Sequence, residues 1–278
     1  MASYGSDGSG CTRSAPCATF FSALNVTPEG GLLRCADQYS DFTFQPTVTI
    51  SHSVTIDCSG VNGSTTRTGA NGFIINGPGI SVTIRGLIIH SILPGQFSGP
   101  GAIGIDIQAA ASVTIEDCTI RNFTTQGVFD RRGSAGKLII KNTFIGGISN
   151  GPAVAVAGPS RNYVVLDNVT AVGNKYGVAV ATGNTGIISG STLSGNSVSG
   201  VQADSLAQVV VDRSTIDHNN IGVTGNAAVR LSNNNIVFNS TALSGGTGTF
   251  GNNRFSGNSA MGTAPTPLGN ASSDFAQQ

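Results

Sequence analysis

Five short segments decide the fold of this chain, and they read VTIR (82–85), VTIE (113–116), LIIK (138–141), VVLD (164–167) and VVVD (209–212). Each segment is apolar at its first and third positions and ends on a charged residue. Successive side chains of a β-strand point to opposite faces, so each segment predicts a short strand with one buried face. The recurrence of one strand pattern along the chain predicts a repeat architecture.

The residues that follow these segments define the repeat. Four positions beyond the charged residue of each segment lies an apolar or small residue: Ile89, Ile120, Ile145, Ala171 and Ile216. Leu193, Ile236 and Phe255 continue the same column. A unit of this length cannot bury its inner face alone, whereas stacked units can. The period therefore predicts an all-β fold, a parallel β-helix of about nine to ten coils. Leucine-rich repeats have a similar period, but the recurring Leu and the helix that each of their units needs are not seen.

Two polar columns accompany the apolar one. Asn recurs three residues after it, at Asn174, Asn196, Asn219, Asn239 and Asn258. Amides in such a column can bond from coil to coil, and Asn tolerates the left-handed turn conformation. The second column alternates in charge through Arg85, Glu116, Lys141 and Asp167. Neighbouring opposite charges favour this register by about 0.2–1 kcal/mol per pair, and we interpret both columns as structural.

The N-terminal end needs a cover, because an open coil exposes unpaired backbone and apolar surface. The segment APCATFFSALN (15–25) predicts a short helix that lies over the first coil. Pro16 suits the first turn of a helix, and Phe20, Phe21 and Leu24 can share one face.

The C-terminal tail from 259 to 278 has no period and is rich in Ala, Ser, Gly and Pro, which predicts a loop or disorder. We therefore expect three parts: residues 1–30 with the capping helix, residues 31–258 as the β-helix, and residues 259–278 as the tail.

The composition excludes several classes of protein. The formal net charge is zero and charged residues make up 10%, so no basic stripe for nucleic acid is expected. No apolar run is long enough for a membrane span, and Met1 is followed by polar residues rather than by a signal peptide. Neither the ligand spacings of metal sites nor a Gly-x-Gly-x-x-Gly motif is present, so we expect no metal and no cofactor.

The five cysteines bear on the cellular compartment. Cys11 and Cys17 are close in sequence, Cys35 and Cys58 follow similar apolar strands one coil apart, and Cys118 stands alone. Two disulfides and one buried thiol would suit an exported protein, and Cys35 and Cys58 could bridge two coils. Four reduced, structurally inert thiols are the alternative, and the sequence leaves the pairing open.

Three stretches carry a resemblance to a known family: GSDGSGCTRSAPCATFFSALNVTPEGG near the start, VTISHSVTIDCSG in the second coil and FGNNRFSGNSAMGTAPTPLG near the end. With them the chain resembles exported bacterial right-handed parallel β-helix repeat proteins over nearly its whole length. The resemblance implies a right-handed, single-stranded parallel β-helix of the pectate-lyase-like fold, and an extracellular or periplasmic location. Most members have no assigned activity, and related folds include polysaccharide lyases, hydrolases, epimerases and phage tailspikes.

Long segments between strands predict where a cleft could lie, because insertions in a solenoid gather on the binding face. The two longest occur early, at 59–72 and 91–104, and the late coils have little room for such loops. We therefore expect a cleft beside the coils from about Asn71 to Tyr176.

The segment GVFDRRGSAG (127–136) supplies the densest charges of that zone, in Asp130, Arg131 and Arg132. Strand alternation places Asp106 outward and Asp130 at a strand end on the neighbouring coil. Paired carboxylates serve glycoside hydrolysis, and a neighbouring arginine could bind a uronate or stabilise an anion. The alternative is a solvated turn in which Asp130 pairs with an arginine, an interaction of less than about 1 kcal/mol.

A second candidate pair is His90 and Arg121, which occupy one outward column on neighbouring coils. Together they could supply the base and the anion-binding group of a lyase, and exposed polar residues are the alternative. Asp217 and His218 are adjacent in sequence, so in a strand they would point to opposite faces.

Two functions follow from these observations. The first is an exported β-helix that presents a side to a polysaccharide or cell-surface glycan without catalysis. The second is a polysaccharide lyase or glycoside hydrolase that uses the candidate residues. The chain has no Trp and only four Tyr, which leaves few rings for sugar stacking. A purely structural scaffold that assembles end to end is a third reading, which the capping helix at one end disfavours.

Overall fold

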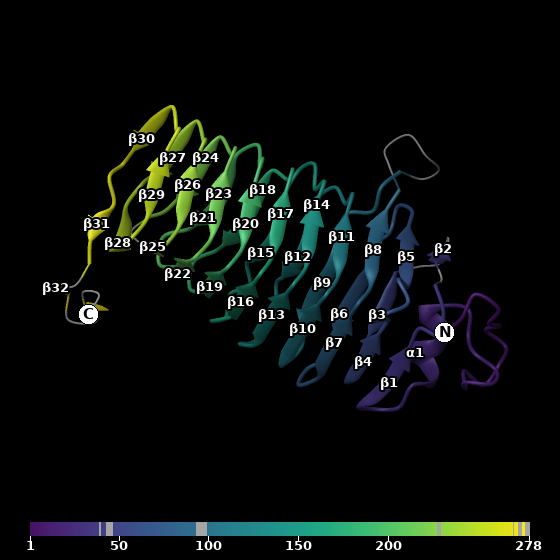
Figure 1. Cartoon of the computed structure of the whole chain (residues 1–278). Coiled ribbons are helices and arrows are strands. Elements are labelled where there is room, and N and C mark those ends of the chain that lie inside the picture. The colour runs from purple at the N-terminus through teal and green to yellow at the C-terminus, as the bar shows by residue number, and fades with distance from the viewer. Residues whose placement is uncertain are drawn as a thin grey trace.

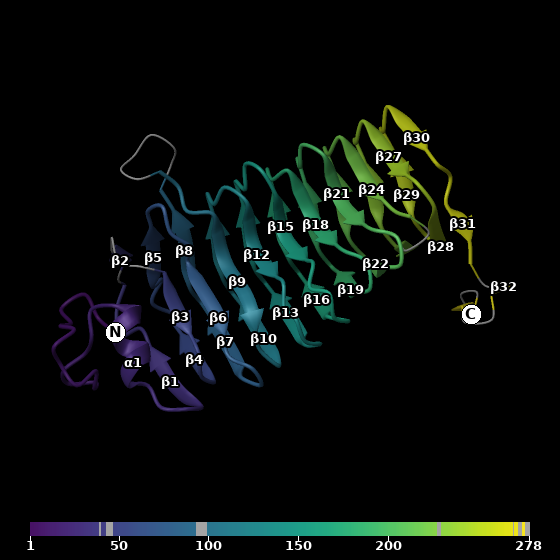
Figure 2. The same cartoon turned by 180° about the vertical axis from the view of Figure 1, so that it is seen from behind.

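The computed structural model of the chain describes residues 1–38, 40–42, 47–92, 99–226, 229–268, 270–271 and 274–275. Three parallel sheets run the length of a rod, with the N-terminus and the helix α1 at one end and the C-terminus at the other (Figures 1 and 2). The predicted parallel β-helix is confirmed, and the strands form successive triplets, one strand in each sheet per coil.

Within the described residues, sheet A has eleven strands, in spatial order β1 (Gly31–Arg34), β4 (Val54–Asp57), β7 (Ser81–Arg85), β10 (Ser112–Glu116), β13 (Lys137–Lys141), β16 (Tyr163–Asp167), β19 (Thr185–Ser189), β22 (Gln208–Asp212), β25 (Val229–Ser232), β28 (Thr247–Gly251) and β31 (Thr266–Pro267).

Sheet B has ten, again counting described residues, in the order β2 (Ser40–Phe42), β5 (Ser64–Arg67), β8 (Ile88–Ser91), β11 (Thr119–Arg121), β14 (Phe144–Gly146), β17 (Thr170–Val172), β20 (Thr192–Ser194), β23 (Thr215–Asp217), β26 (Asn235–Val237) and β29 (Arg254–Ser256).

Sheet C has ten over the same part of the chain, in the order β3 (Val48–Ile50), β6 (Phe73–Asn76), β9 (Ile103–Ala109), β12 (Gln126–Asp130), β15 (Pro152–Val156), β18 (Tyr176–Val180), β21 (Ser199–Ala203), β24 (Ile221–Thr224), β27 (Thr241–Ser244) and β30 (Ala260–Gly262).

The predicted columns are confirmed as strand register. Ile120 pairs with Ile89 on one side and with Ile145 on the other, and the column continues to Phe255. Its residues up to Ile236 are fully buried, so this column forms part of the core that fills the solenoid. The charged column is also in register, and Arg85 Nε donates to Glu116 Oε2 at 3.1 Å.

The Asn column forms the predicted ladder at the corner between sheets B and C. Asn196 Nδ2 donates to Asn219 Oδ1 at 2.9 Å, and Asn219 Nδ2 donates to Asn239 Oδ1 at 3.0 Å. The side-chain Oδ1 of each Asn also accepts the backbone N–H of the Asn on the preceding coil. The ladder therefore satisfies backbone groups that the turn leaves unpaired.

A second ladder, which was not predicted, fills the corner between sheets A and B. Its members are buried or half-buried side chains that each accept a backbone N–H from the preceding coil: Thr143, Ser191, Ser214, Asn234 and Asn253. The residue type in this column changes from Thr through Ser to Asn along the chain, and that variation hides the repeat in the sequence.

The capping helix is shorter than predicted. Helix α1 spans Phe20–Val26, because Thr19 is extended and its hydroxyl accepts the N–H of Ser22 as an N-cap. The Phe20 ring packs edge-on against Phe73 with centroids 5.5 Å apart, so the helix covers the first coils as expected. Pro16 lies outside the helix and Phe21 is exposed, which corrects the prediction for both residues.

The tail departs from the prediction of loop or disorder. Strand β30 pairs with β27 and β31 pairs with β28, so residues up to Pro267 extend the sheets. Beyond them β32 (Asn270–Ala271) and β33 (Asp274–Phe275) form a short antiparallel pair. The three-part division at residues 30 and 258 stays a prediction.

Two further expectations concern loops and cysteines. The segment 59–72 contains β5, a regular strand of sheet B, and residues 93–98 of the other long segment lie outside the described residues. Disulfides join Cys11 to Cys17 and Cys35 to Cys58, while Cys118 is a buried thiol. Among the residues that the structure describes, no helix has the length and hydropathy that a membrane span requires.

Candidate functional site

Asp106 and Arg131 form an ion pair on the outer face of sheet C. Arg131 donates from Nε to Asp106 Oδ1 and from Nη2 to Oδ2, both at 2.8 Å. Gln108 Nε2 donates to the same carboxylate at 2.8 Å, and Asp106 is 1% exposed although it points outward. The carboxylate is therefore occupied by donors, and it raises the pKa of Arg131 by accepting these bonds.

The guanidinium of Arg131 is the accessible half of that pair. It lies over the Phe129 ring, 5.7 Å from its centroid, and its side chain is 46% exposed. Phe129 and Asp106 are partners in strand register, so the ring and the charge share one surface. The arrangement can present a fixed cation to a ligand, whereas Asp106 itself is covered by its partners.

Asp130 and Arg132 lie inside the solenoid rather than on a solvated turn. Asp130 pairs in register with Ile107, whose side chain points into the core, and Arg132 follows in the turn toward sheet A. Arg132 donates from Nε to Asp130 Oδ1 at 2.8 Å and from Nη2 to Oδ2 at 2.6 Å. Neither side chain is exposed, so the solvated turn expected for these two residues is corrected.

The two carboxylates do not face each other. Asp106 points outward from β9 and Asp130 points inward from β12, each bound to its own arginine. Asp106 and Asp130 therefore lie on neighbouring coils, as expected, but on opposite faces of sheet C rather than on one shared surface. The catalytic role of these residues stays a prediction.

His90 and Arg121 are neighbours on the outer face of sheet B, as predicted. They are partners in register, and the Nε2 of His90 lies 2.7 Å from the hydroxyl of Thr66 on the preceding coil. Burial and the positive charge of Arg121 lower the pKa of His90 below its ordinary value, against a smaller opposing effect of the Ser91 backbone. His90 is therefore held in its neutral form near pH 7.

An aromatic ring continues this row on the next coil. Arg121 pairs in register with Gly146, and a Cβ on that glycine would lie 2.7 Å from Phe144 Cζ. The glycine thus leaves room for the exposed Phe144 ring to lie over β14. His90, Arg121 and Phe144 form a row of imidazole, guanidinium and aromatic ring.

A groove on the outer face of sheet A was missed by sequence reasoning. Its volume is about 460 Å³, and it is lined by Tyr163, Thr185, Gly186, Ile187, Gln208, Val210, Arg230 and Phe250. It runs from β16 to β28, mostly beyond the zone of 71–176 in which a cleft was expected. The sequence did carry a signal: the outward middle position of sheet A changes from Thr83 and Thr114 to aliphatic residues such as Ile187 and Val210.

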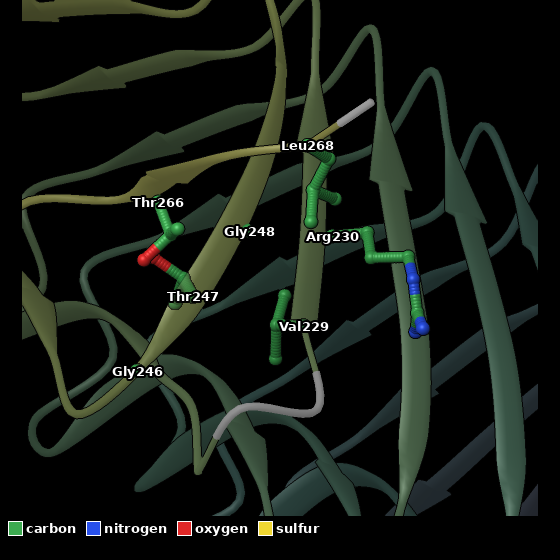
Figure 3. Close-up of a pocket in the computed structure, with 7 residues that line it drawn as sticks. All are labelled: Val229, Arg230, Gly246, Thr247, Gly248, Thr266 and Leu268. Atoms are coloured by element: carbon green, nitrogen blue, oxygen red, sulfur yellow. The ribbon is translucent and has the colours of Figure 1, made fainter. Parts of the chain in front are cut away.

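Arg230 connects this groove with a smaller hollow of about 160 Å³ at the C-terminal end. Figure 3 shows the Arg230 side chain extending away from Leu268 and over the neighbouring coil. Leu268 packs onto Gly248, where an added Cβ would lie 2.6 Å from Leu268 Cδ1. The tail thus closes the end of the sheet A face.

Metal ligation has no support in the part of the chain that the structure describes, where no group of three or more His, Cys, Asp or Glu could hold an ion.

Several solved structures are similar to this chain. The crystal structure of pectate lyase Pel9A matches with a TM-score of 0.69 and 14% identity, covering 95% of this chain and 77% of that one. A periplasmic alginate epimerase, AlgG, matches with a TM-score of 0.48 and 13% identity, covering 85% of this chain and 76% of that one. The A-module of the mannuronan C-5 epimerase AlgE4 from Azotobacter vinelandii matches with a TM-score of 0.47 and 12% identity, covering 86% of this chain and 91% of that one. At 14% identity, the likeness to Pel9A shows the fold alone.

A comparison with curated protein sequences finds no match. The family described as right handed beta helix region matches residues 101–262, which is more than half of the chain and most of its coils. The chain therefore belongs to the right handed beta helix family.

Proposed function

We propose that this chain is an exported protein that binds a polysaccharide along the outer face of sheet A. The observation that carries the proposal is the groove between Tyr163 and Phe250, whose volume of about 460 Å³ falls in the range of ligand-binding clefts. The groove runs across several coils, so it suits an extended ligand better than a compact one.

The lining of the groove matches the amphipathic character of a sugar chain. The rings of Tyr163 and Phe250 offer flat apolar surfaces, and Ile187 and Val210 form an apolar floor. Gln208 and Arg230 supply hydrogen-bond donors, and the guanidinium suits the carboxylate of a uronate. The exposed ring of Tyr163 at one end, the half-buried ring of Phe250 at the other and the polar groups between them can hold sugar rings and their hydroxyls together.

Two further observations support the class of ligand and the location. Pectate lyase Pel9A, which has the same fold at a TM-score of 0.69, is by its name a polysaccharide-acting protein. The two disulfides favour an oxidising compartment, because the cytosol keeps thiols reduced.

Binding is favoured over hydrolysis by the arrangement of the carboxylates. A glycosidase needs two carboxyl groups that flank one glycosidic bond. Asp106 and Asp130 are instead on opposite faces of sheet C, and each is neutralised by an arginine.

A lyase activity at His90 is the second candidate. A lyase removes the proton next to a uronate carboxylate, and this step needs a neutral base and a cation that stabilises the resulting anion. His90 has a lowered pKa, and Arg121 lies beside it in the same column. The exposed Phe144 ring, one coil further, could support a sugar.

A glycan-array screen followed by product assays tests both candidates. Each glycan that binds is incubated with the protein and assayed for new reducing ends and for the ultraviolet absorbance of unsaturated uronate. Binding without product supports the proposal. Product that is lost in His90→Gln and kept in the matched variant His52→Gln would replace it with the lyase, and absence of all glycan binding would overturn both.

A further inference from the structure

The corner between sheets B and C contains a backbone position that is Gly or Asn in five of seven successive coils. The position has a positive φ in successive coils, and it is occupied by Asn122, Gly147, Gly173, Gly195, His218, Phe238 and Gly257. Gly and Asn adopt this conformation readily, whereas a bulky side chain is strained there. His218 (φ 54°) and Phe238 (φ 56°) therefore call for an explanation that the fold alone does not provide.

The two unusual residues form one exposed stack. Their ring centroids are 5.5 Å apart at an interplanar angle of 30°, and Phe238 is 57% exposed. The next coil has Gly257 at this position, and a Cβ there would lie 2.5 Å from two carbons of the Phe238 ring. The glycine makes room for the Phe238 ring, which lies against it, and more than half of the residue's surface stays open to solvent.

Hydrogen-bonding groups surround the stack. Asp217 Oδ2 lies 3.0 Å from His218 Nδ1, which corrects the expectation that these neighbours point apart: His218 is in the turn, not in the strand. Asp217 and Ser256 occupy outward positions of sheet B beside the rings. A single ring among polar groups suits an amphipathic ligand, whereas a protein interface needs a continuous apolar patch.

We infer that His218, Phe238 and Asp217 form a second sugar-binding site, at a corner of the solenoid that is separate from the groove on sheet A. The C–H face of one sugar ring lies on Phe238, and its hydroxyls bond to Oδ2 of Asp217, the oxygen beside His218, to Ser256 and to the imidazole of His218. Because the carboxylate of Asp217 would repel a uronate, the ligand is a neutral sugar residue. The inference rests on the proposed function only in its class of ligand, a polysaccharide.

The test uses two variants that relieve the same strain. Leu206 is also a bulky, exposed residue with a positive φ (65°), and it lies in a turn between sheets C and A. Phe238→Asn and Leu206→Asn should both raise the melting temperature, because Asn tolerates this conformation. The migration of each protein is then compared between a native gel without polymer and native gels that contain galactomannan, xyloglucan or dextran.

We expect at least one of these neutral polymers to retard the parent protein and Leu206→Asn equally. Phe238→Asn should bind that polymer about two- to tenfold more weakly, the effect expected for loss of one aromatic contact. Addition of the polymer should also shift the imidazole NMR signals of His218.

Equal retardation of Phe238→Asn and the parent would overturn the inference, as would retardation by none of the three polymers. Tyr163→Ala separates this failure from failure of the proposed function. If acidic polysaccharides bind through Tyr163 while Phe238→Asn changes nothing, the groove stands and the second site falls.

Discussion

Arg132 and Asp130 form an ion pair inside the solenoid, with Arg132 Nη2 2.6 Å from Asp130 Oδ2 and neither side chain exposed. Arg132 Nη1 also donates to the carbonyl of Ala110 at 3.1 Å, so the buried guanidinium bonds the preceding coil as well. The pair occupies an inward position that Val156 and Val180 fill on the next coils. At this point in the core an ion pair therefore takes the place that an apolar valine side chain fills on each of the next two coils.

We predict that Asp130→Asn lowers the free energy of unfolding by about 3–5 kcal/mol, because it leaves the Arg132 charge buried without its partner. Urea unfolding followed by circular dichroism measures the change. The matched variant Asp204→Asn, at an exposed turn, should stay within about 0.5 kcal/mol of the parent. Equal small effects of both variants would contradict the buried pair.

The Asn ladder gives a second prediction about stability. Asn219→Ala removes the acceptor of Asn196 and the donor to Asn239, and both partners are buried. Unsatisfied buried polar groups cost about 1–3 kcal/mol, so the unfolding free energy should fall by that amount. Asn235→Ala on the exposed face of β26 is the control. If the ladder did not stabilise the fold, both variants would have the same free energy of unfolding.

His90 should make stability depend on pH. Its pKa in the folded protein lies below the ordinary value of 6.5, so the unfolded chain takes up the proton first as the pH falls. The contribution of neutral His90 is therefore fully present above pH 6.5 and is lost as the pH falls through the folded pKa. His90→Gln should flatten the pH profile of the melting temperature below pH 6.5. An unchanged slope in that variant would show that His90 is not the group responsible.

Cys118 should be unreactive in the native protein. Burial raises the pKa of its thiol to about 11, and the side chain is enclosed in the core. A thiol reagent at pH 8 should therefore label no cysteine in the folded chain and one after unfolding without reductant. Rapid labelling of the native protein, or labelling of more than one thiol after unfolding, would contradict the burial or the two disulfides.

The architecture could be predicted from the sequence because each coil repeats the same physical constraints. The apolar column from Ile89 to Phe255 and the Asn column from Asn174 to Asn258 are visible as single residue types at a regular interval, and both match the register. The ladder through Thr143, Ser214 and Asn234 was hidden, because different side chains perform the same role in it.

The candidate site was less predictable, because it depends on which way individual side chains turn. The sequence places Asp106 and Asp130 on neighbouring coils. It does not show that Arg131 pairs with Asp106 on the surface, or that Arg132 and Asp130 are buried together. The groove on sheet A is made by outward aliphatic residues and by Tyr163 and Phe250, which lie far apart in the chain. Residues at that distance meet only once the coils are stacked.

The affinity of Tyr163→Ala for an acidic polysaccharide that binds the parent is the most direct test of the central claim. Isothermal titration of the parent, of Tyr163→Ala and of the matched variant Tyr4→Ala measures it, since Tyr4 is an exposed tyrosine outside the groove. We predict that Tyr163→Ala weakens binding about tenfold and that Tyr4→Ala leaves it unchanged. Equal affinities of all three proteins would contradict a polysaccharide site on the outer face of sheet A.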